Sequence, residues 1–334
     1  MRIGLIGTGR IGSFHAAALA RRPDAGSLLL ADADPARAAR LADRLGATAA
    51  PSVEQVFSWG VDALVVACAT EGHAELVVRA VRGGLPVFCE KPVAPDLDRT
   101  LAVLREVAAV RGVLQLGFMR RFDAGCRTAR ELVRSGALGR LHTVRTMTAD
   151  PAPPPAAYLA TSGGLYRDCM VHDFDMVRWV TGREAVEVYA VGSDAGPAVF
   201  RETGDVDTAA ALLTLDDGTL VSSTATRCNG AGYDVRMEFA GELDQVSSGL
   251  DDRTPIASTE PHGPPPASKP WGGFLERFGP AYEAELGAFV KLVRGEGPNP
   301  CDGREGLAAF RIAEACERSR REGRPVRLEE LPDL

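Results

Sequence analysis

The sequence predicts an α/β domain with a doubly wound parallel sheet, followed by an α+β domain with a largely antiparallel sheet. Three observations carry this prediction. Up to about residue 118, short apolar runs alternate with segments of helical period, which is typical of βαβ units. A glycine-rich turn separates the first apolar run from the first helical segment. Beyond residue 118, β-rich runs predominate, and Asp216-Asp217-Gly218 between two of them indicates a hairpin.

Length and composition fit two globular domains. A chain of 334 residues holds about two domains, and the change of pattern places the boundary near residue 120, which gives domains 1–120 and 121–334. The fractions of hydrophobic residues (45%) and charged residues (25%) disfavour disorder and coiled coils. The net charge of -7 provides no basic field, so no nucleic-acid partner is expected.

The sequence also predicts the compartment. The longest apolar run, Ala63 to Ala69, is far shorter than the ~20 residues that cross a bilayer, so no membrane partner is expected. The N-terminus reaches glycines and Arg10 before any secretory apolar region develops. Seven cysteines without a CxxC pair favour reduced thiols over disulfides or structural zinc. We therefore expect a cytoplasmic protein.

In the first domain, each expected strand is an apolar run and each expected helix has start or stop signals. Asp34 and Pro35 provide a cap and a first-turn proline, and Gly46 ends that helix. Ser52 with Gln55 is typical of a capping box. The expected strands are 2–6, 28–31, 61–69, 86–90 and 113–118, and the expected helices are 36–45, one from about 74 to 83 and one from about 96 to 112.

In the second domain, the proline-rich stretches 151–155 and 264–266 are expected to be extended surface loops. Proline lacks the N–H that a strand donates to its neighbour, and its ring fixes φ. The expected strands are 141–149, 184–192, 207–215, 218–227, 233–240 and 243–247, and the expected helices are 124–135, 165–181, 280–294 and 303–321.

The glycine-rich turn is Gly7-Thr8-Gly9-Arg10-Ile11-Gly12, a GxGxxG that follows a strand and opens a helix. This context indicates a dinucleotide-binding Rossmann unit. Gly7 permits the tight turn, Gly9 lets the backbone approach a pyrophosphate, and Gly12 allows close packing of helix on strand. The helix N-terminus adds N–H donors and a positive dipole end. The residues expected to bind the cofactor are Gly7, Gly9, Arg10, Ile11, Gly12, Asp32, Thr70 and Glu90.

Asp32 at the end of the second expected strand selects the cofactor. Its carboxylate would accept from an adenosine 2′-hydroxyl and repel a 2′-phosphate, so NAD is expected in preference to NADP. The alternative is that the glycines only form a turn and Asp32 only caps the next helix. Fingerprint, acidic residue and βαβ pattern agree independently, which favours the cofactor. The chain has no GxxxxGK[ST] motif, and nothing indicates a flavin domain.

Two further groups of residues have the chemistry of a catalytic site. Lys91 follows the strand expected at 86–90, at the edge where open α/β sheets bind ligands. Asp168 and His172 are four residues apart and would share one face if this segment is helical. A carboxylate beside an imidazole can hold the histidine pKa near neutrality, which suits a general base for an alcohol.

Other interpretations of these residues, which give them no role in acid–base catalysis, stay open. A lysine such as Lys91 is most often a solvated surface charge. Asp168 and His172 could form a structural pair, or could bind a metal together with Asp173 and Asp175. Their spacing matches neither HExxH nor a cysteine-containing zinc pattern, so no metal is expected.

Several strings resemble those of the Gfo/Idh/MocA family of NAD(P)-dependent sugar and polyol oxidoreductases, and within it those of the inositol dehydrogenases. The resemblance runs almost end to end, up to Gly323-Arg324-Pro325-Val326. Glu90-Lys91-Pro92 matches the family's EKP, and Asp168 with His172 matches its DxxxH pair. The more specific strings are Gly117-Phe118-Met119-Arg120-Arg121-Phe122-Asp123, Asp150-Pro151-Ala152-Pro153-Pro154-Pro155, Gly163-Gly164-Leu165 and His172-Asp173-Phe174-Asp175-Met176.

The resemblance implies NAD-dependent oxidation of a ring hydroxyl of myo-inositol or a close cyclitol to the ketone. His172 would remove the hydroxyl proton, Asp168 would orient and tune His172, and Lys91 would donate to the developing alkoxide. A small-molecule polyol and a second copy of the chain, in a homodimer or homotetramer, are the implied partners. The expected substrate-binding residues are Lys91, Arg120, Asp150, His172 and Tyr233.

Two alternatives to this function stay open. One is the same chemistry on another inositol isomer, an aminocyclitol precursor or a pyranose sugar, because the chain departs from the inositol dehydrogenases at two places. Ala149 stands where an arginine often precedes Asp-Pro, and Ala231 stands where an aromatic residue often precedes Gly-Tyr-Asp. The other is a non-catalytic NAD-bound sensor, which the combination of Lys91, Asp168 and His172 disfavours.

Overall fold

The computed structural model describes all 334 residues, and they form two compact units. The first unit comprises Met1–Met119, Pro280–Leu307 and Asp333–Leu334. The second comprises Arg120–Gly279 and Ala308–Pro332. The segment Pro280–Leu307 thus belongs to the first unit, although the division of the sequence at residue 120 places it in the second domain.

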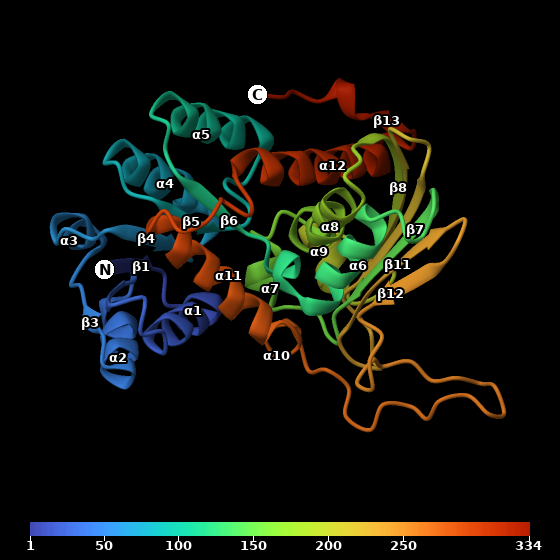
Figure 1. The fold of residues 1–334 in the computed structure, drawn as a ribbon, viewed down its shortest axis with the longest axis horizontal. Helices are drawn as coiled ribbons and strands as arrows, with labels where there is room; N and C mark the ends of the chain where they lie inside the picture. The colour runs from blue at the N-terminus through green and yellow to red at the C-terminus, as the bar shows by residue number, and fades with distance from the viewer. The chain divides into compact units, whose positions relative to one another are not determined.

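The first unit is built on a six-stranded sheet in the order β3-β2-β1-β4-β5-β6 (Figure 1). All five neighbouring pairs are parallel, so the predicted doubly wound sheet is confirmed. The expected run 61–69 forms a strand only in its centre, and the two-residue β3 has no pattern of its own in the sequence. The strands are β1 Arg2–Ile6, β2 Ser27–Ala31, β3 Thr48–Ala49, β4 Ala63–Val66, β5 Val87–Glu90 and β6 Leu114–Gly117.

Several helices of this unit begin or end at the predicted signals, although the helix expected at 96–112 already ends at Ala109. The Asp34 side chain accepts from the Ala36 N–H, and Ser52 caps the next helix. Gly46 ends a helix with a φ of +64°. Leu286 and Phe289 of α11 pack into the core of the parallel sheet, which explains why this late helix belongs to the first unit. The helices are α1 Arg10–Ala20, α2 Pro35–Leu45, α3 Val53–Ser58, α4 His73–Arg82, α5 Leu97–Ala109 and α11 Gly279–Val293.

The second unit is built on a seven-stranded sheet in the order β12-β11-β7-β10-β9-β8-β13. Its neighbouring strands are antiparallel except for β7 and β10, which run parallel, so the predicted largely antiparallel sheet is confirmed. Gly218, with a φ of +85°, closes the predicted hairpin between β9 and β10. The strands are β7 Leu141–Ala149, β8 Ala185–Ser193, β9 Thr208–Leu215, β10 Leu220–Thr226, β11 Asp234–Gly241, β12 Gln245–Ser248 and β13 Val326–Arg327.

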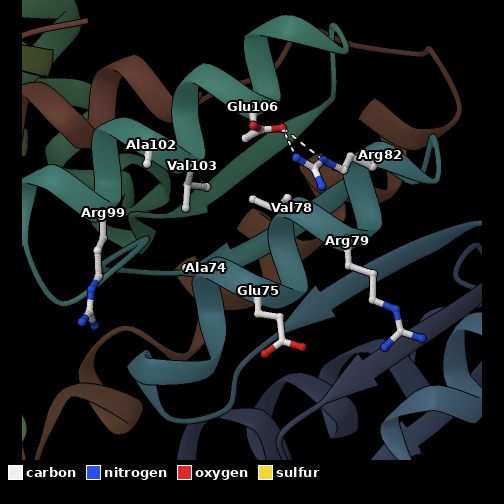
Figure 2. A pocket seen from close by; sticks show the side chains of 9 residues that line it. All are labelled: Ala74, Glu75, Val78, Arg79, Arg82, Arg99, Ala102, Val103 and Glu106. Atoms are coloured by element: carbon white, nitrogen blue, oxygen red, sulfur yellow. Dashed lines mark hydrogen bonds and ion pairs between the residues drawn. The ribbon is translucent and has the colours of Figure 1, made fainter.

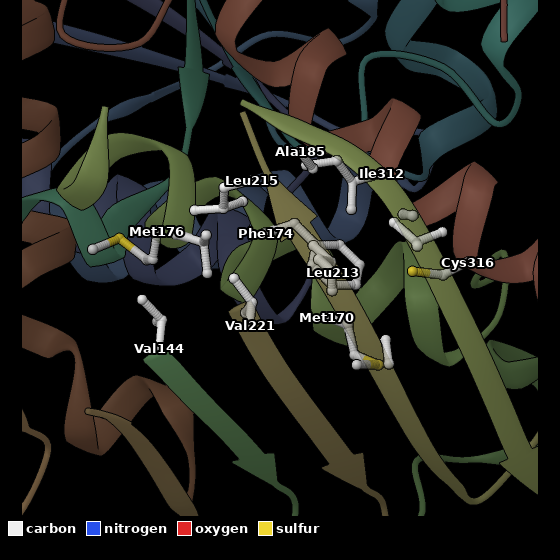
Figure 3. Packing of buried hydrophobic residues seen from close by; sticks show 14 of the residues in the cluster. Val144, Met170, Phe174, Met176, Ala185, Leu213, Leu215, Val221, Ile312 and Cys316 are labelled. Carbon is white, nitrogen blue, oxygen red and sulfur yellow. The ribbon is translucent and has the colours of Figure 1, made fainter. Parts of the chain in front are cut away.

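One face of this sheet carries the core of the second unit. Figure 3 shows Met170 and Phe174 packed with Val144, Leu213 and Val221 of the strands. The expected helix 165–181 begins as the π-helix η3, and the short helices α7, α9 and α10 were not expected. The helical elements are α6 Ala124–Arg134, α7 Ala156–Leu159, η3 Tyr166–Met170, α8 Val171–Thr181, α9 Ala198–Thr203, α10 Phe274–Arg277 and α12 Gly303–Glu322, the last with residues in both units.

The other face of the sheet is exposed and partly apolar, with Tyr189, Val191, Leu212 and Leu220 all accessible to solvent. The proline run 264–266 lies in a long loop that extends from this unit after β12 (Figure 1). No helix in the structure combines the length and the apolar character that a bilayer-spanning segment requires.

Candidate active site

The turn after β1 has the backbone that the fingerprint predicts. Gly7 has a φ of +98°, and a Cβ there would lie 2.3 Å from the Cys68 nitrogen. A Cβ on Gly12 would lie 1.8 Å from the Gly7 oxygen, so neither position accepts a larger residue. By contrast, a Cβ on Gly9 would meet nothing within 4 Å. The turn therefore leaves open space at the N-terminus of α1, where the backbone can approach a pyrophosphate.

Asp32, directly after β2, is bonded to this turn. One carboxylate oxygen accepts from the Thr8 N–H at 2.6 Å and from the Thr8 hydroxyl at 2.8 Å. The other accepts from the Asp34 N–H at 2.9 Å. Burial opposes ionisation, but the hydrogen bonds from Asp34 and Thr8 outweigh it and lower the pKa of Asp32. Asp34 provides the helix cap, so the capping alternative does not explain Asp32.

Glu90 ends β5 and is held by a histidine that the sequence analysis did not select. His15 of α1 is fully buried, and its Nε2 lies 2.5 Å from a carboxylate oxygen of Glu90. The rings of Phe88 and Tyr282 contact the imidazole edge-on. The helix that begins at the glycine turn is therefore bonded to the residue that precedes Lys91. The two partners are 75 residues apart, so no spacing rule could pair them.

A second buried histidine joins two turns at the same edge of the sheet. His73 begins α4, as expected, and its Nδ1 lies 2.8 Å from the Pro92 carbonyl oxygen. Its Nε2 lies 3.2 Å from the Cys68 carbonyl oxygen. Carbonyl oxygens only accept hydrogen bonds, so both bonds form together when both ring nitrogens carry hydrogen. His73 thus links the turn after β4 to the segment that contains Lys91.

The predicted cofactor residues share one edge of the parallel sheet. They follow or end strands β1, β2, β4 and β5, and carboxyl ends of parallel strands meet at one edge. The strand order reverses between β1 and β4, which is where doubly wound sheets bind ligands. The residues brought together are Gly7, Gly9, Arg10, Ile11, Gly12, Asp32, Thr70 and Glu90, with Lys91 directly after β5.

In the second unit, the predicted acid–base pair lies where a helix changes its winding. Asp168 belongs to the π-helix η3, and His172 is the second residue of α8. Single π-turns within helices are frequent at functional sites. Gly163 and Gly164 precede this segment with φ values of +84° and +91°, which only glycine adopts readily.

Two residues absent from the predicted set hold the Asp168 carboxylate. The Tyr158 hydroxyl donates to one oxygen at 2.8 Å, and the Arg227 Nη2 donates to the other at 2.6 Å. The Arg227 Nη1 donates to Asp150 at 3.1 Å. Burial raises the pKa of Asp150, and neighbouring Asp168 raises it further, although Arg227 opposes both. Two of the predicted site residues, Asp150 and Asp168, therefore bind the same arginine, Arg227.

Arg120 and Asp173 form a buried pair. The Arg120 Nη1 donates to Asp173 at 2.6 Å, and Nη2 donates to the Thr148 hydroxyl at 3.1 Å. The neighbouring Arg121 binds Asp175 through two hydrogen bonds of 2.9 and 2.5 Å. Asp173 and Asp175 are therefore bonded to arginines, and no group of three or more metal-binding side chains occurs in the structure.

Tyr233 and Asp150 present different hydrogen-bonding groups. Burial raises the pKa of the Tyr233 hydroxyl, so this hydroxyl keeps its proton near neutral pH. Its backbone N–H donates to the Trp271 oxygen at 3.0 Å. Asp150 uses one oxygen for Arg227 and for the Cys169 thiol. The other oxygen has no hydrogen-bond partner, and the side chain is 22% exposed.

A groove of about 610 Å³ on the first unit lies between α4 and α5 (Figure 2). Arg82 is bonded to Glu106 across it. None of the predicted site residues lines this groove. Its lining is Ala74, Glu75, Val78, Arg79, Arg82, Arg99, Ala102, Val103 and Glu106.

Family profiles match both parts of the chain. One described as an oxidoreductase family with an NAD-binding Rossmann fold matches residues 1–118. Another, described as the GFO/IDH/MocA C-terminal domain, matches residues 126–246. The chain belongs to the Gfo/Idh/MocA family of oxidoreductases. The resemblance carried by the EKP and DxxxH strings is thereby confirmed.

Several relatives match this Gfo/Idh/MocA protein over nearly its whole length. A myo-inositol dehydrogenase of Streptomyces leeuwenhoekii is 40% identical, with 97% of this chain and 98% of the relative covered. A myo-inositol 2-dehydrogenase of Thermotoga maritima is 35% identical, with 99% of each covered.

Solved structures of inositol dehydrogenases share the fold. A myo-inositol dehydrogenase of Corynebacterium glutamicum has a TM-score of 0.90 at 34% identity, with 100% of this chain and 99% of that chain covered. A scyllo-inositol dehydrogenase of Lactobacillus casei, solved with NAD(H) and scyllo-inositol bound, has a TM-score of 0.88 at 28% identity, with 98% and 99% covered.

Proposed function

We propose that this oxidoreductase oxidises a ring hydroxyl of myo-inositol, or of a close cyclitol, to the ketone with NAD. One observation carries the proposal: the likeness to an inositol dehydrogenase solved with NAD(H) and scyllo-inositol bound covers 98% of the chain. The chain also retains Lys91, Asp168 and His172, the acid–base set that oxidation of an alcohol requires.

The open space at Gly9 and the N-terminus of α1 fit a pyrophosphate, and Asp32 fits a ribose that carries two hydroxyls. We assign Arg10, Ile11 and Thr70 to the same cofactor. The ionised Asp32 would repel a 2′-phosphate, which supports NAD over NADP. When bound, NAD supplies the hydride acceptor at C4 of its nicotinamide.

Residues of the chain remove the hydroxyl proton and stabilise the negative charge that develops on the oxygen. His172 takes the proton of the reacting hydroxyl, and Asp168 orients the imidazole and stabilises its protonated form. Lys91 donates to the oxygen as negative charge develops on it, which lowers the barrier by several kcal/mol in a water-poor site. The bonds from His15 to Glu90 and from His73 to Pro92 fix the residues on both sides of Lys91.

The remaining hydroxyls of a cyclitol need fixed polar partners. Asp150 offers a carboxylate oxygen that has no partner within the protein, and Tyr233 offers a protonated hydroxyl. A polyol hydroxyl can donate to the first and accept from the second. Arg120 stays in the proposed set, and its buried pair with Asp173 is the competing use of that side chain.

We also propose that the protein is a cytoplasmic homodimer or homotetramer. The exposed face of the second sheet carries Tyr189 directly opposite Leu212 on the neighbouring strand, with Val191 and Leu220 nearby. An apolar patch on a sheet face is typical of an interface between copies. All seven cysteines are thiols in the structure, which supports a reducing compartment.

The test is NADH formation, followed by its absorbance, across a panel of inositol isomers, aminocyclitols and pyranose sugars. Turnover of myo-inositol with the highest kcat/KM supports the proposal, and a higher value with another substrate reassigns the substrate. The same assay with NADP should give far slower turnover, and Asp32→Asn should narrow that gap. No absorbance change with any polyol, despite tight NAD binding, would identify a sensor instead.

A further inference from the structure

Arg227 and Asp150 emerge side by side from two parallel strands. Asp150 directly follows β7, and Arg227 directly follows β10. The last residues of these strands, Ala149 and Thr226, are paired in register. The Asp150 N–H donates to the Thr226 oxygen at 2.9 Å, and the Arg227 N–H donates to the Asp207 oxygen at 2.8 Å. The backbone therefore fixes where both side chains start.

The Arg227 guanidinium bridges two carboxylates. It is buried, with 4% of its side chain exposed, and it bonds Asp150 through Nη1 and Asp168 through Nη2. The guanidinium is planar and its donors form a rigid fork, so it sets both the separation and the orientation of its two acceptors. A lysine in the same place has a single nitrogen and cannot reproduce this geometry.

The negative charges of Asp150 and Asp168 require a cation between them, which Arg227 provides. Asp150 and Asp168 are close enough that Asp168 raises the pKa of Asp150, as does burial. Arg227 is the cation that opposes both effects, and the Tyr158 hydroxyl adds a donor to Asp168. Without Arg227, two partly buried carboxylates would face each other and would either take up a proton or move apart.

We propose that Arg227 is a positioning residue for the oxidation, which joins the carboxylate that binds the polyol, Asp150, to the carboxylate that orients the base His172, Asp168. This inference rests on the proposed function and deepens it. Arg227 itself contacts neither hydride nor proton. It fixes the position of the bound polyol relative to the base. Loss of Arg227 therefore misplaces the reacting hydroxyl relative to His172.

The test is steady-state kinetics of Arg227→Met and Arg227→Lys in the full chain, with thermal unfolding and NAD binding measured beside them. Misplacement by about 1 Å costs on the order of 100-fold. We expect Arg227→Met to lose about that factor in kcat and to raise KM for the polyol. The KM and Kd for NAD should stay within about twofold, because the glycine turn and Asp32 are unchanged. Arg227→Lys should recover part of kcat, because it keeps the charge without the fork.

The matched control is Arg167→Met. Arg167 lies in η3 next to Asp168, but it binds Glu314 of α12 instead of Asp150 or Asp168. Its loss should lower the unfolding temperature and leave kcat of the folded enzyme within about twofold of the wild type. A merely structural Arg227 would behave in the same way.

Each outcome decides the proposal. A kcat of Arg227→Met within about twofold of the wild type, or a loss no larger than that of Arg167→Met, overturns it. If Arg227→Met does not fold, Arg227→Lys decides, and an unchanged kcat for that variant overturns the positioning role. A wild-type enzyme that oxidises no polyol overturns the proposed function, and this inference with it. An active wild type with an active Arg227→Met overturns only the inference.

Discussion

Arg121 and Asp175 form a two-pronged ion pair inside the second unit, with hydrogen bonds of 2.9 and 2.5 Å. Arg120 directly precedes Arg121, and it forms a second buried ion pair with Asp173, two positions before Asp175, through one hydrogen bond of 2.6 Å. Asp173 and Asp175 lie in α8, the helix that carries His172. These residues come from two of the family-specific strings. The string 117–123 provides the arginines, and the string 172–176 provides the carboxylates that bind them. Together they fix the orientation of the helix that carries the proposed base.

Loss of the carboxylate from the Arg121–Asp175 pair should lower the free energy of unfolding. Asp175→Ala removes the carboxylate from this buried ion pair, which typically costs about 3–5 kcal/mol. Urea unfolding should show a loss of about that size. The exposed pair Arg140–Glu242 provides the control, because Glu242→Ala should cost about 1 kcal/mol or less. Equal costs for the two variants would contradict the role of the buried pair.

His172→Ala should abolish turnover and leave NAD binding nearly intact. The variant removes the proposed base, whereas Asp32 and the glycine turn lie in the other unit. Kinetics and NAD titration of the same preparation provide the check. His142→Ala is the control, because His142 is exposed on β7 and bonds only to neighbouring Thr143. An unchanged kcat/KM for His172→Ala removes this residue from the mechanism.

His15→Leu should weaken both the fold and the reaction. It removes the partner of a Glu90 carboxylate oxygen inside the first unit, and an unsatisfied buried group costs about 1–3 kcal/mol. Because Glu90 precedes Lys91, we also expect kcat to fall at temperatures where the variant is fully folded. His262→Leu, in the exposed loop after β12, serves as the control. A variant that loses stability but keeps kcat would restrict His15 to a structural role.

Asp32 should make stability depend on pH at the acidic end. Its pKa in the folded protein lies below the ordinary value of 3.8, so the folded state binds the proton less readily than the unfolded state. Its contribution is fully present above about pH 4 and is lost as the pH falls through the folded pKa. Urea unfolding of the wild type and Asp32→Asn should therefore differ most above pH 4 and converge below it. A difference that grows on acidification would contradict this sign.

Leu212→Glu should prevent assembly without unfolding the chain. Leu212 of β9 lies on the exposed face of the sheet and is 60% exposed, so a charge costs little in an isolated copy. In an interface the same charge would be buried without a partner. Light scattering should report a smaller species with an unchanged circular dichroism spectrum. Leu243→Glu, at an exposed turn outside the sheet, is the control. An unchanged mass for Leu212→Glu would place any interface elsewhere.

Short sequence signals by themselves determined several local elements of this fold. The fingerprint glycines predicted the turn after β1, Asp34 and Pro35 predicted the start of α2, and Asp216-Asp217-Gly218 predicted the hairpin. Each of these signals acts within a few residues, so a single sequence contains it. Alternation of strands and helices then placed Asp32 and Lys91 at one edge of a parallel sheet, because that edge follows from the direction of the chain.

Only the tertiary structure determined which side chains meet. Arg227 lies 77 residues from Asp150 and 59 from Asp168, and His15 lies 75 from Glu90. In the sequence these residues are indistinguishable from solvated charges or ordinary helix residues. Burial and backbone register give them their partners, since an ion pair or a buried hydrogen bond depends on distance in space and not on spacing along the chain. For the same reason α11 joined the first unit: its apolar face packs on a sheet whose last strand ends at Gly117.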